Sequence, residues 1–174
     1  CDARPGQDIT LSGPYRSPFQ MPQDKSANLV MIGTGTGVAP FRAFAQLMYE
    51  RRGGWDGQVR LFYGGRTGLD LAYANDEETN LADYYDQASF KAFKSLASNS
   101  LMSSSDALQR GLRENLDEVW DLLQAPKTHV FLAGLGKIAQ VLDKVMSERA
   151  GSAEAWQALK QGMIQEGRWS ELIY

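Results

Sequence analysis

Apolar residues follow two arrangements along this chain, and the two arrangements alternate. Short apolar runs, typical of buried strands in a parallel sheet, occupy residues 28–33, 58–64 and 128–133, and a shorter strand is expected at 169–174. Helices are expected at residues 40–52, 70–85, 106–123, 137–149 and 152–165, with Ser152 as the cap of the last one. The alternation predicts an α/β fold, with a parallel sheet between two layers of helices.

Residues 89–98 fit two patterns. Phe90, Phe93 and Leu96 have the spacing of a helical stripe, whereas the alternating fold requires a further strand at this point of the chain. The strand alternative completes a parallel, doubly wound sheet of five strands with helices on both faces. Residues 99–105 then form a serine-rich loop, which either covers a ligand or is simply mobile.

The first residues of the chain have the pattern of a strand without a partner. Turns are expected at Pro5-Gly6 and Gly13-Pro14, with a short alternating strand at residues 9–11 between them. An isolated strand cannot bury its apolar side. Residues 1–25 are therefore expected to be the end of a preceding domain and its linker, and residues 26–174 the α/β domain.

A glycine-rich turn joins the first strand to the helix that follows. It contains Gly33, Thr34, Gly35, Thr36, Gly37, Val38 and Pro40. The glycines lack the Cβ that would keep a phosphate away from the backbone N–H groups, and the two threonines add hydroxyl donors. Pro40 suits the first turn of a helix, where its missing N–H has no intrahelical partner. A strict dinucleotide motif has glycine in place of Val38, so the turn predicts a nucleotide diphosphate site of a related kind.

Two further glycine turns follow strands. They are Gly64-Gly65-Arg66 and Gly134-Leu135-Gly136-Lys137. Because ligands of parallel α/β sheets bind at the carboxyl ends of the strands, the three turns are expected to converge on one crevice. Arg66 either reaches the diphosphate there or is an exposed loop arginine. Lys137 starts a helix, where the helix dipole disfavours a cation, so it either faces an anion or is solvated.

The composition narrows the function classes. With 174 residues, 43% of them hydrophobic, and a net charge of −3, the chain has no basic face that would suggest a nucleic-acid partner. No apolar run is long enough to span a bilayer, and the single cysteine cannot form an internal disulfide, so a cytoplasmic protein with no membrane partner is expected. No residue spacing indicates a metal site or a Ser-His-Asp set. His129 lies in an apolar strand, where a structural role is more common than a catalytic one.

The string from Gly33 to Phe41 resembles the G-T-G-x-A-P turn of the ferredoxin–NADP reductase family, and the likeness covers nearly the whole chain. Residues 61–66 resemble that family's second-strand motif, and Ala133-Gly134 resembles its Cys-Gly turn beside the nicotinamide. The ending resembles plant-type members, in which a C-terminal aromatic residue stacks on the flavin. Residues 1–22 resemble the closing segment of the family's FAD-binding β-barrel.

The resemblance implies an oxidoreductase that, as a full-length protein, moves hydride between NAD(P)H and FAD and then delivers electrons to a ferredoxin or an oxygenase component. NADP(H) is the expected nucleotide, with NAD(H) as the alternative, and FAD would be held by the barrel domain. Iron–sulfur clusters elsewhere in the parent chain are compatible with this role. The chain alone is expected to be inactive.

The resemblance also implies roles for single residues. Tyr174 and Gly134 would lie nearest the reacting rings, with Tyr174 as a gate that stacks on the flavin. Within the family, residues 61–67 and Tyr84-Tyr85 resemble the reductase components of benzoyl-CoA epoxidases.

The chain departs from the family at three places. Ala133 replaces the family's cysteine, and Leu172 stands where plant-type members have glutamate, with Glu171 one position away. The Ser-Arg pair of NADPH-specific members is represented by Ser98-Asn99, without a matching tyrosine. The cations that could neutralise a 2′-phosphate instead are Lys91, Lys94 and Arg110. The departures leave a second hypothesis open, a non-catalytic nucleotide-binding or sensing module.

Overall fold

Five parallel strands form one sheet in the computed structural model of the chain, which describes all residues except 1–3, 11, 14–16, 69–70, 72–83 and 85. The strands are β1 (Asn28–Thr34), β2 (Val59–Gly65), β3 (Phe90–Leu96), β4 (Thr128–Gly134) and β5 (Trp169–Ile173), in the order β3-β2-β1-β4-β5. Every neighbouring pair runs parallel. The predicted doubly wound α/β fold is therefore confirmed.

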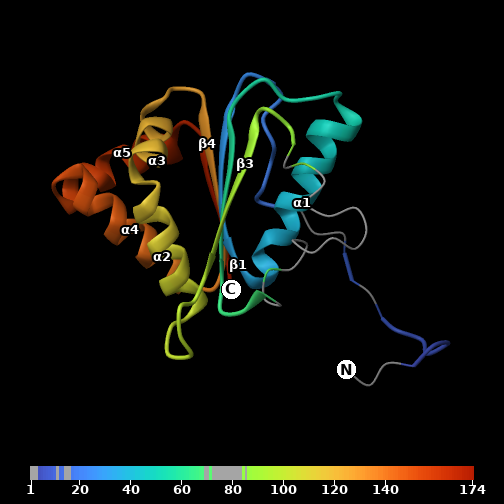
Figure 1. Cartoon of the computed structure of the whole chain (residues 1–174). Helices are drawn as coiled ribbons and strands as arrows, with labels where there is room; N and C mark the ends of the chain where they lie inside the picture. The colour runs from blue at the N-terminus through green and yellow to red at the C-terminus, as the bar shows by residue number, and fades with distance from the viewer. Residues whose placement is uncertain (1–3, 11, 14–16, 69–70, 72–83, 85) are drawn as a thin grey trace.

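Helices cover both faces of the sheet, as Figure 1 shows with the sheet nearly edge-on. One layer has α1 (Ala39–Ala45), with a 3-10 turn before it at Gly35–Val38 and wider π-type turns after it at Gln46–Arg51. The other layer has α2 (Ser104–Glu114), α3 (Leu116–Gln124), α4 (Lys137–Ala150) and α5 (Ala153–Gln165). Each layer has its own hydrophobic core against the sheet, because the strands are apolar on both faces.

Residues 89–98 contain a strand, β3, and no helix. Phe93 stacks on Phe62 of β2 with ring centroids 4.5 Å apart and packs on the core beneath α2. Phe90 is buried in the core on the opposite side of the sheet. A spacing of three puts two strand residues on opposite faces, so the apparent helical stripe was never on one side.

The helix expected at residues 106–123 is in fact two helices. The chain leaves the helical conformation at Asn115, where φ is −123° and ψ is 28°, so that α2 ends before it and α3 begins after it. The Asn115 side-chain amide donates to the Gly111 carbonyl at 2.9 Å. Asparagine competes in this way for backbone hydrogen bonds, which explains a break that apolar periodicity does not indicate. The predicted cap of α5 is confirmed, since the Ser152 hydroxyl accepts from the Ala155 N–H at 3.1 Å.

The strand expected at residues 9–11 is wrong for the two residues that the structure describes. Ile9 and Thr10 lie outside any strand, and Ile9 is 68% exposed, because the described sheet offers this segment no partner strand. Most of the helix expected at residues 70–85 falls outside the described residues. Phe19 and Met21 are buried, with the Phe19 ring stacked on Phe41 at 5.9 Å, so the segment before residue 25 contributes to the core.

Candidate nucleotide-binding site

The carboxyl ends of the strands bring the three glycine turns to one edge of the sheet, which we call the carboxyl edge. β1 pairs residue for residue with β2 as far as Thr34 and Gly64, and with β4 as far as Gly33 and Ala133. The turns that follow these strands therefore start side by side, at the lower edge in Figure 1. The predicted convergence of the turns on one edge is confirmed, and it is the edge where such sheets bind ligands. Their sharing of one crevice stays a prediction.

The glycines of the first turn have two different functions. Gly35 has φ +55°, and no described atom lies within 4 Å of the place where its Cβ would be, so its backbone is open to a ligand. A Cβ on Gly37 would overlap the Ala133 carbonyl and lie 2.9 Å from the Gly134 nitrogen, so this glycine lets the turn pack on β4. The Tyr63 hydroxyl donates to the Gly35 carbonyl at 3.0 Å and supports the turn from β2. The turn is thus packed against β4 at Gly37 and open to a ligand at Gly35.

Three further residues of this turn, Gly33, Val38 and Pro40, have structural roles. A Cβ on Gly33 would lie 3.0 Å from the Phe41 ring. Val38 is fully buried in the core below the turn, which explains a valine where the strict motif has glycine. Pro40 lies in the first turn of α1, as predicted. Contact of these residues with a nucleotide stays a prediction.

Thr34 has the one buried side-chain polar atom that lacks a hydrogen-bond partner among the described residues. The residue is 3% exposed, and a Cβ on Gly134 would lie 2.7 Å from its Oγ1. Gly134 also has φ +140°, a conformation that favours glycine. An unpaired buried hydroxyl costs about 1–3 kcal/mol of stability. A ligand group that reached Thr34 would supply the missing bond, so this residue fits a hydrogen-bonding ligand at the carboxyl edge.

The last residue of the chain connects the first turn to the third. The Tyr174 N–H donates to the Gly134 carbonyl at 3.1 Å, and the Tyr174 hydroxyl lies 2.7 Å from Thr36 Oγ1. Both side chains are exposed at this edge. Three residues predicted for the site are thus linked through hydrogen bonds. Either hydroxyl can be the donor in this contact, so a phosphate that accepts the Thr36 proton competes with Tyr174 only where Thr36 is the donor.

An ion-pair network fixes β5, the strand that leads to Tyr174. Lys160 of α5 is 8% exposed and lies 3.0 Å from an Asp143 oxygen and 3.4 Å from a Glu171 oxygen. The Trp169 indole N–H donates to Glu171 at 2.6 Å. Glu171 therefore faces the α5 side of the sheet, where it has a structural role, whereas Leu172 packs against the opposite core.

The second turn and the loop after β3 lie at the same edge. Gly65 pairs with Leu96 at the ends of β2 and β3, and Arg66 follows as an exposed residue. Ser98 is exposed and its hydroxyl donates to Met102 Sδ at 2.9 Å. Arg66 and Ser98 thus stand at the edge at which the sequence places the nucleotide.

The third turn leads from β4 into α4. Leu135 is 55% exposed, and Gly136 and Lys137 are exposed as well. The pKa of Asp106 is lowered chiefly by hydrogen bonds from Ser103, with a smaller contribution from the charge of Lys137. Lys137 therefore lies close to the start of α2.

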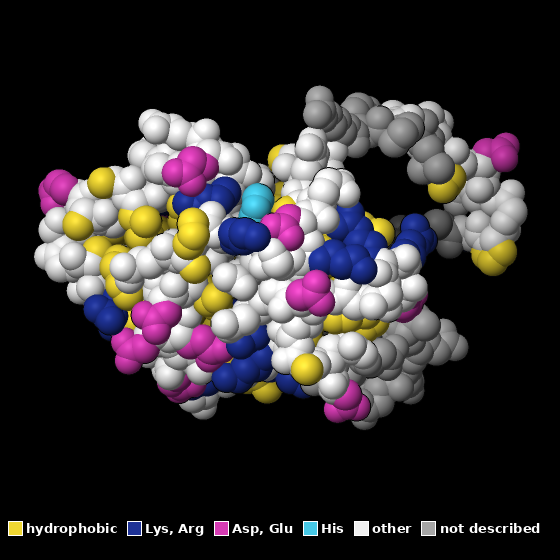
Figure 2. Space-filling model, turned by 90° about the horizontal axis from the view of Figure 1, so that it is seen from above, with side chains coloured by type: hydrophobic (Ala, Val, Ile, Leu, Met, Phe, Trp, Pro, Cys, Tyr) yellow, Lys and Arg dark blue, Asp and Glu magenta, His cyan; other side chains and the backbone are white. Residues whose placement is uncertain are grey.

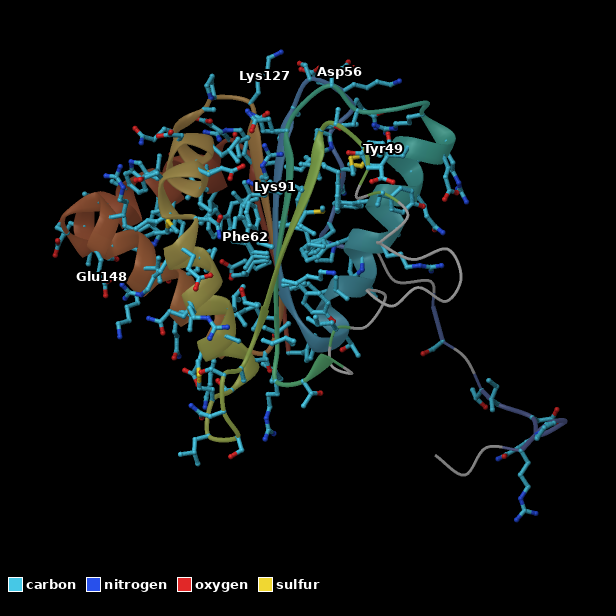
Figure 3. All side chains as sticks on the ribbon, in the orientation of Figure 1. Tyr49, Asp56, Phe62, Lys91, Lys127 and Glu148 are labelled. Carbon is cyan, nitrogen blue, oxygen red and sulfur yellow. The ribbon has the colours of Figure 1, made fainter. Side chains whose placement is uncertain are left out.

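Two cations considered for a 2′-phosphate have other partners. Lys91 lies 3.0 Å from Glu118 in the amino half of β3, away from the carboxyl edge (Figure 3), so its candidacy was wrong. Arg110 donates to the Leu96 carbonyl and lies 3.6 Å from Glu114. Lys94 is an exposed residue in the middle of β3 and is not without a partner either.

His129 lies far from the glycine turns. It pairs with Leu29 near the amino ends of β4 and β1. Burial lowers its pKa, and the nearby charge of Arg168 lowers it further. These surroundings favour the neutral imidazole and are consistent with the structural role that the sequence indicates.

Sequence reasoning missed two supports of the site. The bond from Tyr63 to Gly35 had a signal, because Tyr63 directly precedes the glycines at the end of a strand. The contact between Thr36 and Tyr174 had none, since the two residues are 138 positions apart.

Among the described helices none is long and apolar enough to cross a membrane. In the described part of the chain, no three His, Cys, Asp or Glu side chains gather as a metal ion would require.

Comparison with known proteins adds a family to this geometry. The model of the oxidoreductase NAD-binding domain family matches residues 31–144. Over its whole length the chain is 30% identical to a ferredoxin–NADP reductase of Synechocystis sp., of which it covers 43%, and 30% identical to the cyanelle enzyme of Cyanophora paradoxa, of which it covers 49%. It is 28% identical to the chloroplastic leaf isozyme 2 of Oryza sativa subsp. indica, again covering 49%. The chain thus spans about half the length of these curated relatives.

Proposed function

Because the chain belongs to the oxidoreductase NAD-binding domain family, we propose that its carboxyl edge binds NADP(H), with NAD(H) as the alternative. The first turn carries this proposal. It is open at Gly35, packed on β4 at Gly37, and presents the Thr36 hydroxyl between them. This arrangement suits a diphosphate, whose oxygens need several close donors and no side chain in the way.

The diphosphate is proposed to lie on the first turn, at Gly35, Thr36 and Gly37. Arg66 and Ser98 extend the contacts along the edge past β2 and β3, and Gly134, Leu135, Gly136 and Lys137 extend them past β4. Thr34 offers its unpaired hydroxyl beside Gly134 to a polar group of the nucleotide. Each contact rests on a residue at the carboxyl edge.

In the full-length protein this domain is proposed to work with FAD in a reductase that takes hydride from NADPH and passes electrons to an acceptor protein. The nicotinamide and the flavin supply that chemistry when bound, and the chain positions them. Tyr174 fits a stacked ring, because it is 60% exposed at the end of a strand whose backbone is fastened to Gly134. We assign it the role of a gate that occupies the place of the nicotinamide until the nucleotide enters.

The acceptor is proposed to be a ferredoxin, the acceptor that the relatives' names print. An oxygenase component, as in a benzoyl-CoA epoxidase system, is the finer alternative, supported by the resemblance of residues 61–67. We place the protein in the cytoplasm. The domain division at residues 25 and 26 is part of the same proposal.

Titration calorimetry of the chain with NADP+ and with NAD+ tests the nucleotide proposal. We expect saturable binding of NADP+ and loss of that binding in the variant Gly37→Val, whose side chain would displace the turn. Absence of heat with both nucleotides would contradict the proposal. The control is Lys127→Gln, a variant at the opposite edge of the sheet. It should bind NADP+ with the same Kd as the unsubstituted chain.

The reductase proposal needs the full-length protein. We expect it to purify with a flavin spectrum and to oxidise NADPH with ferricyanide as the acceptor. A colourless protein that binds NADP+ without oxidising NADPH would instead support the second hypothesis, a non-catalytic nucleotide-binding module.

A further inference from the structure

A cavity of about 420 Å³ lies between the first turns of α2 and α4, at the carboxyl edge. Lys137, Gln140 and Lys144 line it from α4, and Ser103 and Asp106 line it from the start of α2. Its volume lies within the range of small-molecule sites. Because Lys137 directly follows the third glycine turn, the cavity borders the proposed nucleotide crevice.

The two lysines stand on the same face of α4. Gln140 and Val141 come three and four residues after Lys137, and Lys144 comes three residues after Val141 and four after Gln140, which places the four side chains on one face of the helix. Neither lysine forms an ion pair with a residue that the structure describes. Two such ammonium groups on one wall attract an anion that carries more than one charge.

The carboxylate on the opposite wall already has hydrogen-bond partners. Asp106 Oδ2 accepts from the Ser103 N–H at 2.8 Å and from the Ser103 hydroxyl at 2.7 Å, which completes the N-terminal cap of α2. Asp106 can offset the charge of one lysine at most. The cavity therefore keeps a net positive charge.

Two cations considered for a 2′-phosphate from the sequence do not meet the same need. The Arg110 guanidinium is held by the Leu96 carbonyl and by Glu114, and Lys91 is paired in the amino half of β3. The loop after β3 contributes serine and asparagine but no charge at residues 98–100. A phosphate monoester in the cavity would therefore find its counter-charge on α4, whose two lysines line it.

The remaining walls suit the rest of a nucleoside. Leu101 and Val141 offer apolar surface to a base, and Ser105 adds a hydroxyl. α2 also begins directly against the second glycine turn, since a Cβ on Gly64 would overlap the Ser104 carbonyl. A dinucleotide whose diphosphate lies on the first turn can therefore follow the edge into this cavity.

Resting on the proposed function, we infer that the cavity holds the adenosine end of the nucleotide and that Lys137 and Lys144 bind its 2′-phosphate. The two lysines then make the chain select NADP(H) over NAD(H), in place of a cation in the loop after β3. A monoester dianion between two ammonium groups forms charge-assisted hydrogen bonds that NAD(H), with its free 2′-hydroxyl, cannot form.

Calorimetry with NADP+, NAD+, 2′-AMP and 5′-AMP tests this inference on the chain and on the variants Lys137→Gln, Lys144→Gln and the double variant. We expect the Kd for NADP+ and 2′-AMP to rise about tenfold for each single variant and about a hundredfold for the double variant. The Kd for NAD+ and 5′-AMP should change by less than about twofold, because those ligands lack the 2′-phosphate.

Two matched variants control for charge and for the rival cation. Lys127→Gln removes the same charge at the opposite edge, where Lys127 lies 3.0 Å from Asp24, and should leave every Kd unchanged. Arg110→Gln should have a smaller selective effect than either α4 variant. Thermal melts confirm that each variant is folded.

Three results would overturn the inference while leaving the proposed function intact. They are equal binding of NADP+ and NAD+ by the unsubstituted chain, an equal loss of both in the α4 variants, and a larger selective loss in Arg110→Gln. If the unsubstituted chain bound neither nucleotide, the proposed function itself would fail, and the inference with it.

Discussion

Two cavities of similar volume lie at opposite edges of the sheet, the amino edge and the carboxyl edge, and they differ in whether the cations that line them are paired. The cavity at the amino edge, about 410 Å³, includes Tyr49, Arg60 and Ser89 in its lining. The Tyr49 hydroxyl lies 2.9 Å from the Ser89 hydroxyl, and Arg60 donates to the Ser89 carbonyl at 3.1 Å and pairs with Glu118. Figure 2 shows this edge from above, with Lys and Arg side chains among Asp and Glu.

The carboxyl edge has the opposite character. Its cavity of about 420 Å³ presents Lys137 and Lys144 without an ion-pair partner among the described residues, and the turn beside it holds the unpaired Thr34 hydroxyl. The two cavities thus differ in their cations, because Arg60 at the amino edge is paired with Glu118, whereas the two lysines at the carboxyl edge have no ion-pair partner among the described residues. This difference favours the carboxyl edge for an anionic ligand.

The largest effect is expected from Gly37→Val. Its side chain would overlap the Ala133 carbonyl and push the first turn off β4, so nucleotide binding should fall by more than about 100-fold in calorimetry. Gly162→Ala is the control, because a Cβ there meets no described atom within 4 Å. Retention of NADP+ affinity by a folded Gly37→Val variant would remove the first turn from the site.

The amino edge should respond in stability and not in binding. Arg60 has a side chain 14% exposed and paired with Glu118, so Arg60→Gln should lower the free energy of unfolding by about 1–3 kcal/mol in urea titrations. Lys91→Gln removes the more exposed partner of the same carboxylate and should cost less than about 1 kcal/mol. A change in NADP+ affinity in either variant would contradict the division between the two edges.

Thr36→Val should instead weaken NADP+ binding and leave the stability nearly unchanged. The variant removes the hydroxyl between the proposed diphosphate and Tyr174, so the Kd for NADP+ should rise about tenfold while the free energy of unfolding changes by less than about 1 kcal/mol. Tyr174→Phe removes the other half of the same hydrogen bond and leaves the Thr36 hydroxyl to the nucleotide. If both variants weakened binding equally, the Tyr174 hydroxyl would be a ligand donor and not a competitor.

The smallest effect concerns pH and His129. Since burial lowers the pKa of folded His129 from 6.5, the unfolded chain binds the proton more readily, and stability falls as the pH drops below 6.5. In His129→Asn the part of this slope that belongs to the imidazole should disappear in urea titrations between pH 5.5 and 7.5. An identical slope in the variant would show that other groups cause it.

The sequence predicts most of the fold because three of its strands are nearly unbroken apolar runs. The apolar runs of β1, β2 and β4 and the glycine turns after them were sufficient to place the three turns at one edge of the sheet. Residues 89–98 were ambiguous because an edge strand with three exposed positions has too few apolar residues to show its period. Asn115 interrupts a predicted helix because its side chain hydrogen-bonds to the nearby Gly111 carbonyl. The spacing of apolar residues gives no sign of such a local bond.

The site was less predictable than the fold, because its contacts join distant segments. Single turns could be found from their glycines, but the links from Tyr174 to Thr36 and from Lys137 to the start of α2 depend on how the layers pack. Lys144 had no signal of its own, since one exposed lysine on an amphipathic helix is ordinary. Its position on the same face of the helix as Lys137 becomes informative only when the cavity beside that face is known.

Amide chemical-shift mapping of the chain during titration with NADP+ tests the difference between the two edges most directly. We predict saturable shifts at residues 34–37, 134–137 and 103–106, and no shifts at residues 55–60 and 87–89 around the amino-edge cavity. Shifts confined to the amino edge, or spread evenly over both edges, would contradict the account.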